Sequence, residues 1–276
     1  MLLYRTSTGP VLHCEQSWYL IDRPWNDLVN DDSLFETLTQ MLPKHKEDPS
    51  LESVAGKPMA PINDQEIWAA GVTYFRSKTA RMEESQEAGG GDFYDRVYDA
   101  VRPEIFMKAT AQRTVGPGEV MHRRGDSKWI VPEPELTLVI TRTGKIIGYT
   151  IGNDLSCRDI EGENPLYLPQ AKSFDRCASI GPAILVSNEP PAKDAQIKMT
   201  IERSGKVVFE DKTEIAQIKR GFEELAEFLF RDNTHPCGCL LMTGTGIVPP
   251  DEFCLQTGDV VEIEIEGIGK LINSMD

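Results

Sequence analysis

Two apolar segments rich in β-branched residues, 135–141 and 145–152, lie on either side of the sequence Arg142-Thr143-Gly144-Lys145. This pattern predicts two antiparallel strands joined by a tight hairpin, with Thr143 and Gly144 as the two turn residues. The turn fixes the register of the two strands, and the register decides which side chains project together on one face. This hairpin therefore constrains the fold more than any other feature of the chain.

The predicted register brings three carboxylates together where the two strands open out. Glu135 is paired with Gly152, and Glu133 is paired with Asp154. Paired residues project on one face with Cβ atoms roughly 5 Å apart, and Glu133 and Glu135, two positions apart on one strand, share that face. Like charges this close repel by roughly a few kcal/mol per pair in a half-buried site. We therefore expect a cation among the three carboxylates.

Two kinds of cation fit this acidic cluster. Mg²⁺ or Mn²⁺ suits an all-oxygen site, and Ca²⁺ suits it less well. The alternative is a salt bridge to Lys172, the one nearby base, in Gln170-Ala-Lys-Ser-Phe-Asp175. Acidic pairs also arise by chance in a chain with 44 acidic residues, and a one-residue register slip would separate these carboxylates. Spacing alone leaves both interpretations open.

The composition excludes several classes of function. The chain has 276 residues, 29 of them basic and 44 acidic, for a net charge of −15, and it has no basic stripe that would contact nucleic-acid phosphates or an anionic membrane. No apolar run approaches the ~18 residues of a membrane span, and the start of the chain lacks the apolar core of a secretory signal. The six cysteines are scattered, which is typical of reduced thiols. We therefore expect a cytoplasmic protein without nucleic-acid or membrane partners.

The first part of the chain is predicted to form a small unit. Short strands are expected within residues 1–20, and a helix is expected over 31–42, where apolar residues recur at helical spacing. Residues 44–58 are charged and contain proline and glycine, which is typical of a linker. We place a boundary near residue 60, which gives a small N-terminal domain over 1–60 and a catalytic domain over 61–276.

The second part of the chain is richer in strands than in helices. Strands are expected over residues 67–74, 104–108, 176–203 and 259–265, and the most convincing helix over 215–230. Helical candidates at 75–87 and 93–101 flank Gly89-Gly90-Gly91, which we interpret as the hinge of a lid over about residues 75–100. The strands do not alternate with helices in a βαβ rhythm, so the expected class is a β-rich α+β fold with mixed sheets.

The segment His235-Pro-Cys-Gly-Cys239 has the residue types of a soft-metal site. Zinc sites of this kind usually combine two cysteine pairs, and this chain lacks a second Cys-x-Cys pair. We therefore expect a turn with buried thiols at this position.

Three motifs around the hairpin resemble the fumarylacetoacetate hydrolase superfamily. They are Glu133-Pro-Glu135, the segment from Gly148 to Asp159, and Lys172-Ser-Phe-Asp175; the likeness extends through Gly71–Tyr74 and Thr243–Gly246 and covers about residues 65–272. The resemblance implies a β-roll catalytic domain after a small N-terminal domain. It also implies that Glu133, Glu135 and Asp154 bind Mg²⁺ or Mn²⁺, that Lys172 touches the substrate, and that the protein is a homodimer or homotetramer.

Within the superfamily, residues 102–109 and 163–170 resemble the branch that dehydrates 2-keto-3-deoxy sugar acids. A carboxylate-held divalent ion that chelates an α-keto acid polarises its carbonyl and makes the C3 protons more acidic. A dehydratase then removes a C3 proton and expels the C4 hydroxyl, and tautomerisation gives the aldehyde, here the semialdehyde of 2-oxoglutarate. A hydrolase instead brings in an activated water and breaks a carbon–carbon bond.

The residues after Gly71–Tyr74 favour elimination over hydrolysis. Hydrolases of the superfamily commonly carry a water-activating histidine shortly after Gly-x-Asn-Tyr, whereas this chain has Gly71-Val-Thr-Tyr74 with Ser77 at the histidine position. The four histidines lie elsewhere, and His122 is the first candidate for a substitute. Without such a base, water activation at neutral pH has no evident source, and we expect dehydration.

The acid–base and substrate-binding roles can be assigned to named residues. Lys172 and Glu104 are the candidate catalytic residues, because burial beside a cation favours the neutral amine of a lysine and a positioned carboxylate transfers protons. The candidate substrate contacts, each of which has a turn hydrogen bond or a surface charge as its alternative role, are Thr73, Tyr74, Arg76, Lys108 and Thr245.

Other functions stay open at this stage. The chain could be an acylpyruvate-type hydrolase or a decarboxylase of the same superfamily, or a catalytically silent member that binds a keto acid. The intact set of three carboxylates argues against a silent member, because loss of a ligand is the simplest way to inactivate such a site.

Overall fold

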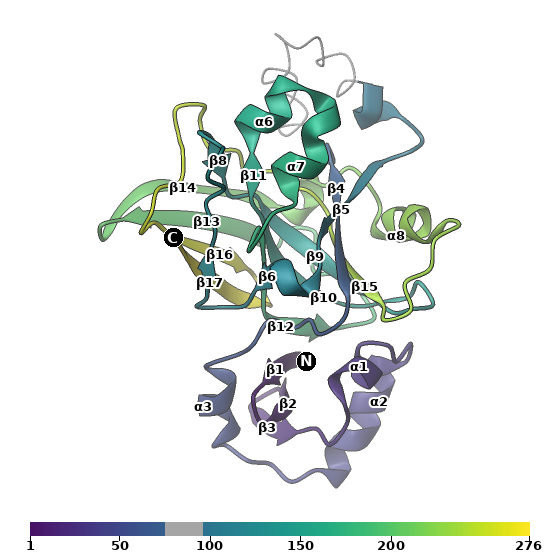
Figure 1. Ribbon diagram of the computed structural model, residues 1–276. Helices are drawn as coiled ribbons and strands as arrows, with labels where there is room; N and C mark the ends of the chain where they lie inside the picture. Colours follow the sequence, from purple (N-terminus) through teal and green to yellow (C-terminus); the bar gives the residue numbers. More distant parts are fainter. Residues whose placement is uncertain (75–95) are drawn as a thin grey trace.

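The structure is a computed structural model of the chain, and it describes residues 1–74 and 96–276 (Figure 1). The described residues form two large sheets, one two-stranded sheet and several short helices. Strands therefore dominate, and the predicted strand-rich α+β class is confirmed. Within these two ranges, no helix is both long enough and apolar enough to cross a bilayer.

The larger sheet has ten strands in the order β3-β2-β1-β12-β10-β9-β15-β4-β5, with β6 paired to β12 outside this path. The β15–β4 and β12–β6 pairs are parallel, and the other pairs are antiparallel. The strands of this sheet are β1 (Leu2–Thr6), β2 (Gly9–Cys14), β3 (Ser17–Leu20), β4 (Glu66–Gly71), β5 (Glu104–Ala109), β6 (Thr114–Val115), β9 (Pro134–Ile140), β10 (Ile146–Asp154), β12 (Ala178–Val186) and β15 (Cys239–Met242).

The second large sheet has five strands in the order β14-β13-β16-β17-β7. Its β17–β7 pair is parallel, and its other pairs are antiparallel. The strands of this sheet are β7 (Val120–Met121), β13 (Gln196–Arg203), β14 (Lys206–Glu214), β16 (Val260–Ile265) and β17 (Gly269–Met275). The two-stranded sheet pairs β8 (Ile130–Val131) with β11 (Ser156–Cys157).

The helices are short and lie around the sheets. The α-helices are α1 (Trp25–Leu28), α2 (Leu34–Met41), α3 (Leu51–Ala55), α6 (Arg158–Glu163), α7 (Leu168–Lys172) and α8 (Phe222–Phe230), and the 3₁₀ helices are η1 (Leu42–Lys44), η2 (Ala111–Arg113), η3 (Pro165–Tyr167) and η4 (Ile215–Gln217). In Figure 1, α1–α3 lie at one end of the molecule with the N-terminal strands, and α6 and α7 lie at the opposite end.

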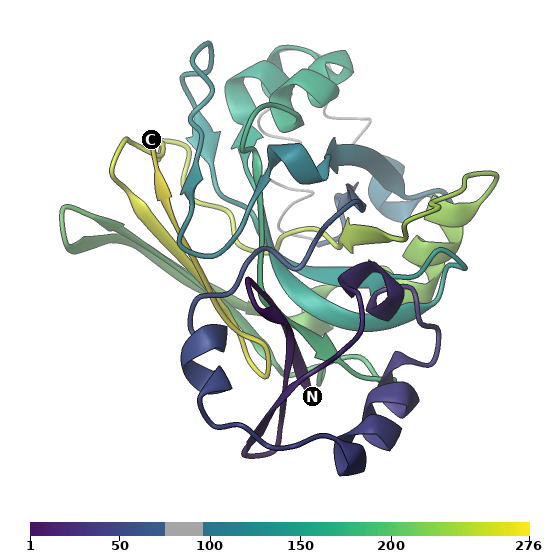
Figure 2. The ribbon, with the colours of Figure 1, turned by 60° about the horizontal axis from the view of Figure 1, so that its bottom comes forward.

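The main hydrophobic core involves both large sheets. In β13 and β16, buried residues alternate with more exposed ones, which is the pattern of strands with one face turned inward. Ile197 and Ile263 of the smaller sheet belong to the same buried cluster as Leu136 and Ile151 of the larger one. Figure 2 shows the long strands of the smaller sheet beside the larger sheet, so the two enclose the core between them.

The hairpin of β9 and β10 lies in the middle of the larger sheet, with β12 on one side and β15 on the other. All 7 residues of β9 are buried, which explains its continuous apolar sequence, because a strand buried on both faces does not alternate. Glu135 is paired with Gly152, as predicted from the turn.

The turn of this hairpin differs from the predicted two-residue form. The Thr141 amide donates to the Lys145 carbonyl at 2.9 Å, so three residues, 142–144, form the loop. Gly144 has φ +90°, a conformation that glycine adopts without strain. A bulge between Ile146 and Gly148 then restores the predicted register along the rest of the hairpin.

The N-terminal residues extend the larger sheet. β1 pairs with β12, with Leu2 opposite Leu185. The buried side chains of Leu12 and Leu38 belong to a second hydrophobic cluster that also includes Val139 and Ile184 of the central strands. Residues 1–60 therefore share both a sheet and a core cluster with the rest of the chain, and the domain boundary near residue 60 stays a prediction.

Two expected elements have different bounds in the structure. The expected linker 44–58 contains α3, because Leu51 and Ala55 are buried against Val11. The helix expected over 215–230 begins only at Phe222, because Gly221 has an extended backbone and residues 215–217 form a 3₁₀ turn.

Part of one prediction lies outside the described residues. The helical candidate 75–87 and the hinge Gly89–Gly91 belong to the segment that the structure does not describe. Of the candidate at 93–101, residues 96–99 are helical. The lid over residues 75–100 therefore stays a prediction.

Candidate active site

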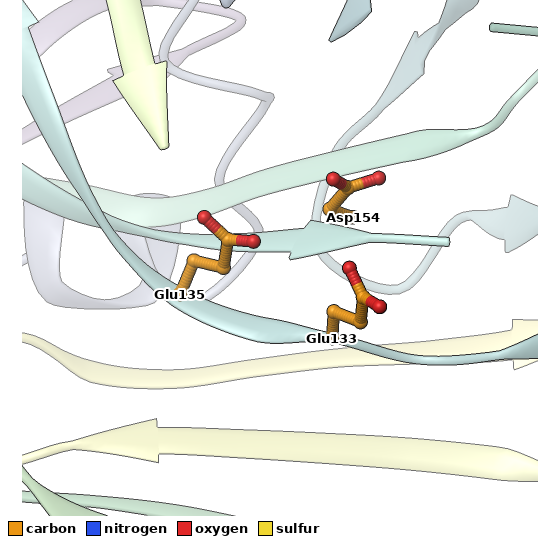
Figure 3. A group of neighbouring side chains, drawn as sticks. All are labelled: Glu133, Glu135 and Asp154. Atoms are coloured by element: carbon orange, nitrogen blue, oxygen red, sulfur yellow. The ribbon is translucent and has the colours of Figure 1, made fainter. Parts of the chain in front are cut away.

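The hairpin places the three predicted ligands at one end of the central strands. Glu133 directly precedes β9, Glu135 is its second residue, and Asp154 is the last residue of β10. The Asp154 amide donates to the Glu133 carbonyl at 3.0 Å, which holds the two backbones side by side. The three side chains project on the same side of the hairpin (Figure 3). Each offers a carboxylate oxygen, and these oxygens all lie within 4.8 Å of one another.

These carboxylates are buried and contact three basic side chains. Glu133, Glu135 and Asp154 are 3%, 2% and 1% exposed, and buried charges need partners. Lys172, the last residue of α7, donates to Glu133 and, at 3.0 Å, to Asp154. The salt bridge that was the alternative role of Lys172 is therefore present in the protein without a bound ion.

Two further basic residues reach the same carboxylates. Lys108 of β5 contacts Asp154 Oδ1 at 2.6 Å, and Arg158, the first residue of α6, contacts Glu133 at 3.5 Å. The acidic cluster is thus held by side chains from three separate elements, β5, α6 and α7.

Glu135 has an electrostatic environment that disfavours its charge. Its carboxylate accepts a hydrogen bond from the Gly244 amide. Burial, followed by the charges of Asp154 and Glu133, raises the pKa of the Glu135 carboxyl well above its ordinary value, and Lys172 and the Gly244 amide offset only part of this effect. Holding Glu135 as an anion therefore requires more positive charge nearby.

The donor set fits a hard divalent cation. Its donors are carboxylate oxygens, which Mg²⁺ and Mn²⁺ prefer, and they come close enough to share one ion. Five carboxylates line the pocket around the cluster: Glu104, Glu133, Glu135, Asp154 and Glu161.

The walls of the pocket combine the carboxylates and basic residues with apolar side chains, among them Val72, Phe106, Leu168 and Val248. Leu168 and Lys172 belong to α7, so this short helix contributes both an apolar wall and a base to the site.

Two other predicted site residues line the same pocket. Glu104, the first residue of β5, is paired with Gly71 of β4. Thr245 lies in the segment after β15, and its hydroxyl donates to the Ile247 carbonyl at 3.2 Å. The structure brings both into the pocket, and their roles stay predictions.

Three further predicted residues are buried close to the site, although they are not among the described residues that line the pocket. The Thr73 hydroxyl donates to the Thr243 carbonyl at 2.6 Å. Burial, followed by the charge of Glu135, raises the pKa of the Tyr74 phenol. Lys108 is 0% exposed. Arg76, the remaining predicted substrate contact, lies outside the described residues.

Arg158 and Glu161 are site residues to which the sequence analysis assigned no role. Both line the pocket and both are 2% exposed. Glu161 accepts a hydrogen bond from the Ser156 hydroxyl at 3.0 Å. Their spacing carried a usable signal, because residues three apart on a helix share a face and α6 follows soon after Asp154.

His122, the candidate substitute base, lies outside the pocket. Its Nδ1 contacts Asp276 Oδ2 at 2.8 Å, and Arg176 contacts the same carboxylate. Among the pocket-lining residues that the structure describes, there is no histidine. The other sequence candidate, His235–Cys239, forms a turn, in which the Gly238 amide donates to the His235 carbonyl at 2.9 Å. Of its two thiols, Cys239 is buried as expected and Cys237 is only half-buried.

The fold and the carboxylate site agree with one protein family. The family model for the C-terminal domain of fumarylacetoacetate (FAA) hydrolase matches residues 67–276. The chain belongs to the fumarylacetoacetate hydrolase family, as the sequence motifs had suggested.

Two similar proteins of this family carry the names of dehydratases. A "Probable 2-keto-3-deoxyxylonate dehydratase" of Haloferax volcanii is 52% identical over 216 residues, which are 78% of this chain and 73% of the relative. A "2-dehydro-3-deoxy-D-arabinonate dehydratase" of Saccharolobus solfataricus is 46% identical over 216 residues, 77% of this chain and 72% of the relative.

A solved structure matches the whole chain. The complex "2-keto-3-deoxy-D-arabinonate dehydratase complexed with magnesium and 2,5-dioxopentanoate" has a TM-score of 0.84 and 34% identity, and the match covers 100% of this chain and 99% of the other. The predicted fold of the fumarylacetoacetate hydrolase type is therefore confirmed.

Proposed function

We propose that this protein is a Mg²⁺-dependent dehydratase that removes water from a 2-keto-3-deoxypentonate and yields 2,5-dioxopentanoate, the semialdehyde of 2-oxoglutarate. The observation that carries the proposal is the buried set of Glu133, Glu135 and Asp154, with Lys172 in contact with two of them. The two relatives named above are dehydratases of such acids by name, and the similar structure holds magnesium and 2,5-dioxopentanoate.

The two substrate names carried by the relatives describe closely related chemistry. Arabinonate and xylonate of one stereochemical series differ in configuration only at C2 and C3. A 2-keto-3-deoxy acid has no stereocentre at either carbon, so within one series the two names denote a single compound. C4 is then the one stereocentre that the pocket has to recognise.

Glu133, Glu135 and Asp154 are the residues that would hold the ion. When bound, Mg²⁺ polarises the 2-oxo group of the keto acid and makes the C3 protons more acidic. Lys172 lies against two of the ligands, so its amine is next to the end of the pocket where the keto group binds. We assign to it the removal of the C3 proton.

Glu104 is placed to assist the leaving group. It lies on the wall formed by β4 and β5, in the same pocket as Lys172. As a carboxylic acid, Glu104 donates a proton to the departing C4 hydroxyl, which leaves as water while the C3–C4 double bond forms. Lys172 keeps the C3 proton at that point, and the product of elimination is a 2-oxo-3-ene that still carries the C5 hydroxyl. Loss of a C5 proton to the Glu104 carboxylate and return of the Lys172 proton to C3 then give the C4–C5 enol, which tautomerises to the aldehyde.

The acylpyruvate hydrolase alternative needs a base that activates water. His122 pairs with Asp276 outside the pocket, and the described lining residues contain no histidine. A decarboxylase, in contrast, would need no acid for a leaving hydroxyl, so Glu104 would have no role in it. The pocket therefore favours the dehydratase.

The assembly and location of the protein are also proposals. We propose a homodimer or homotetramer in the cytoplasm, because the family resemblance implies such an assembly and all six cysteines are free, which suits a reducing compartment. Size-exclusion chromatography with light scattering measures the first, and cell fractionation measures the second.

The metal site can be tested with a matched pair of variants. Asp154→Asn should abolish both calorimetric Mg²⁺ binding and Mg²⁺-dependent dehydration. Asp159→Asn should preserve both, because Asp159 accepts hydrogen bonds from Ser127 and the Lys128 amide and is not among the lining residues described. Undiminished Mg²⁺ binding by folded Asp154→Asn would refute the assignment.

A further inference from the structure

Lys108 lies at the junction of three elements of the site, although it is fully buried. Its ammonium group contacts Asp154 Oδ1 at 2.6 Å. It also donates to the Leu155 carbonyl at 2.8 Å and to the Lys172 carbonyl. The ring of Phe174 lies 5.6 Å from its Nζ atom. Lys108 of β5 thus connects the end of β10 to the end of α7.

Burial and these contacts keep Lys108 away from the pocket. Lys108 donates to two carbonyl oxygens, and its charge pairs with Asp154 Oδ1, an oxygen that accepts no hydrogen bond from the described residues. Lys108 is 0% exposed and is not among the described residues that line the pocket. We therefore expect no direct contact between Lys108 and a substrate in the pocket.

The contact with Lys172 matters because α7 is a weak helix by itself. It has only 5 residues, far fewer than an isolated helix needs to be stable in water. The last carbonyl groups of a helix have no partner within it, and a cation at that end also complements the helix dipole. Lys108 supplies both the hydrogen-bond donor and the positive charge at the Lys172 carbonyl. The side chain of Lys172 extends to the carboxylates.

The contact with Asp154 fixes the other half of the site. Lys108 binds Oδ1 of this carboxylate, and Lys172 binds Oδ2. Because Lys108 pairs with Oδ1, the Asp154 carboxylate keeps Oδ2 turned toward Lys172. Residues that contact a metal ligand in this way, without binding the metal themselves, fix the orientation of that ligand. One buried side chain therefore orients a metal ligand and the backbone of a catalytic base.

We propose that Lys108 is a positioning residue, which acts on the reaction by fixing Asp154 and Lys172 relative to each other and does not touch the substrate. This inference rests on the proposed function only in the role of Lys172 as the base. The connection between β10 and α7 is a property of the protein without ligands, so it can be tested separately.

The test compares Lys108→Met with a surface control, Lys270→Met, whose lysine pairs with Glu262 on the smaller sheet. Amide hydrogen exchange in the protein without Mg²⁺ or substrate should become at least ~10-fold faster in residues 168–174 of Lys108→Met. Exchange in residues 196–214 of the same variant should stay as in the wild type, which separates a local effect from global destabilisation. The surface control should show neither change.

Steady-state kinetics give the second readout, at Mg²⁺ concentrations shown to saturate each variant. A positioning role predicts that kcat falls by roughly 10² because the base is displaced, while KM stays within ~3-fold of the wild-type value. If no keto acid is turned over by any form, the proposed function fails, yet the exchange result still decides the role of Lys108.

Two results would overturn the inference. One is wild-type exchange in residues 168–174 of a folded Lys108→Met protein. The other is a large rise in KM with an unchanged kcat, which identifies a substrate contact. If Lys108→Met does not fold, Lys108→Gln replaces it. Gln keeps two N–H donors for the two carbonyl groups but removes the charge that pairs with Asp154, so exchange in residues 168–174 is not expected to change and the kinetic outcomes decide.

Discussion

Gly71 and Glu104 are paired across β4 and β5, and the carboxyl group of Glu104 lies over the glycine. A Cβ atom at position 71 would be 2.6 Å from the Glu104 carboxyl carbon, which real structures do not tolerate. The backbone of Gly71 is not in the left-handed region, so the glycine is needed for space and not for its conformation. Any side chain at position 71 would push Glu104 away from its place in the pocket.

Gly71→Ala should therefore reduce activity by displacing Glu104. We expect kcat for dehydration to fall by roughly 10², at the lower end of what loss of an acid–base group costs, with Mg²⁺ affinity preserved. Steady-state kinetics and calorimetry measure the two quantities. Gly125→Ala is the matched control, because a Cβ atom there would meet open space. Equal kcat values for the two variants would show that Glu104 has no role in the reaction.

Glu135→Gln should stabilise the protein in the absence of Mg²⁺ while it removes metal binding. The folded state raises the pKa of the Glu135 carboxyl. Below the unfolded pKa of about 4.3, both states are protonated and the charge has no cost. As the pH rises above that value, the unfolded state ionises first, so the wild-type protein loses stability that the variant keeps.

Thermal unfolding in a chelator at pH 5 and pH 8 measures this effect. We expect the variant's Tm to exceed the wild-type Tm at pH 8 by at least ~2–4 °C, which corresponds to about 1 kcal/mol for a domain of this size, and the difference to shrink at pH 5. Glu252→Gln, at an exposed position, is the control and should change neither value. A variant that is less stable than the wild type at pH 8 would contradict the account of Glu135.

Lys172→Met should separate proton transfer from metal binding. The variant removes the base that we propose, so kcat should fall by roughly 10²–10⁴. Mg²⁺ affinity should be retained or should increase, because Lys172 contacts two of the ligands and its charge repels the ion. Calorimetry and single-turnover assays measure both, with Lys270→Met as the surface control. Wild-type kcat in the variant would assign the C3 proton to another residue.

The sequence was sufficient for the acidic cluster because its determinants are local. The turn at Gly144 sets the register, and Asp154 follows from that register on the opposite strand. The bulge between Ile146 and Gly148 was not predictable from the apolar pattern, since it only corrects a turn that is one residue longer. The two deviations cancel before the strands reach the carboxylates.

The environment of the cluster depends on long-range pairing, which no local pattern encodes. Lys108 reaches Asp154 because β5 is joined to the hairpin through β15 and β4. In the sequence, a lysine on a short strand has the same appearance whether it faces a substrate or is buried behind a ligand. The contact between Arg158 and Glu133 could not be predicted either, because it depends on where α6 lies relative to the hairpin.

The most direct test of the central claim compares two classes of substrate in separate assays of one preparation of the purified protein with Mg²⁺. The panel contains 2-keto-3-deoxypentonates of both C4 configurations and several acylpyruvates, and product formation is followed by coupled assays for 2,5-dioxopentanoate and for pyruvate. We predict Mg²⁺-dependent formation of 2,5-dioxopentanoate from one keto-deoxy acid, with a kcat/KM far above that for any acylpyruvate, and loss of this activity in a chelator. Faster release of pyruvate from an acylpyruvate than dehydration of any keto-deoxy acid would contradict the account, and His122 would then be the first residue to replace.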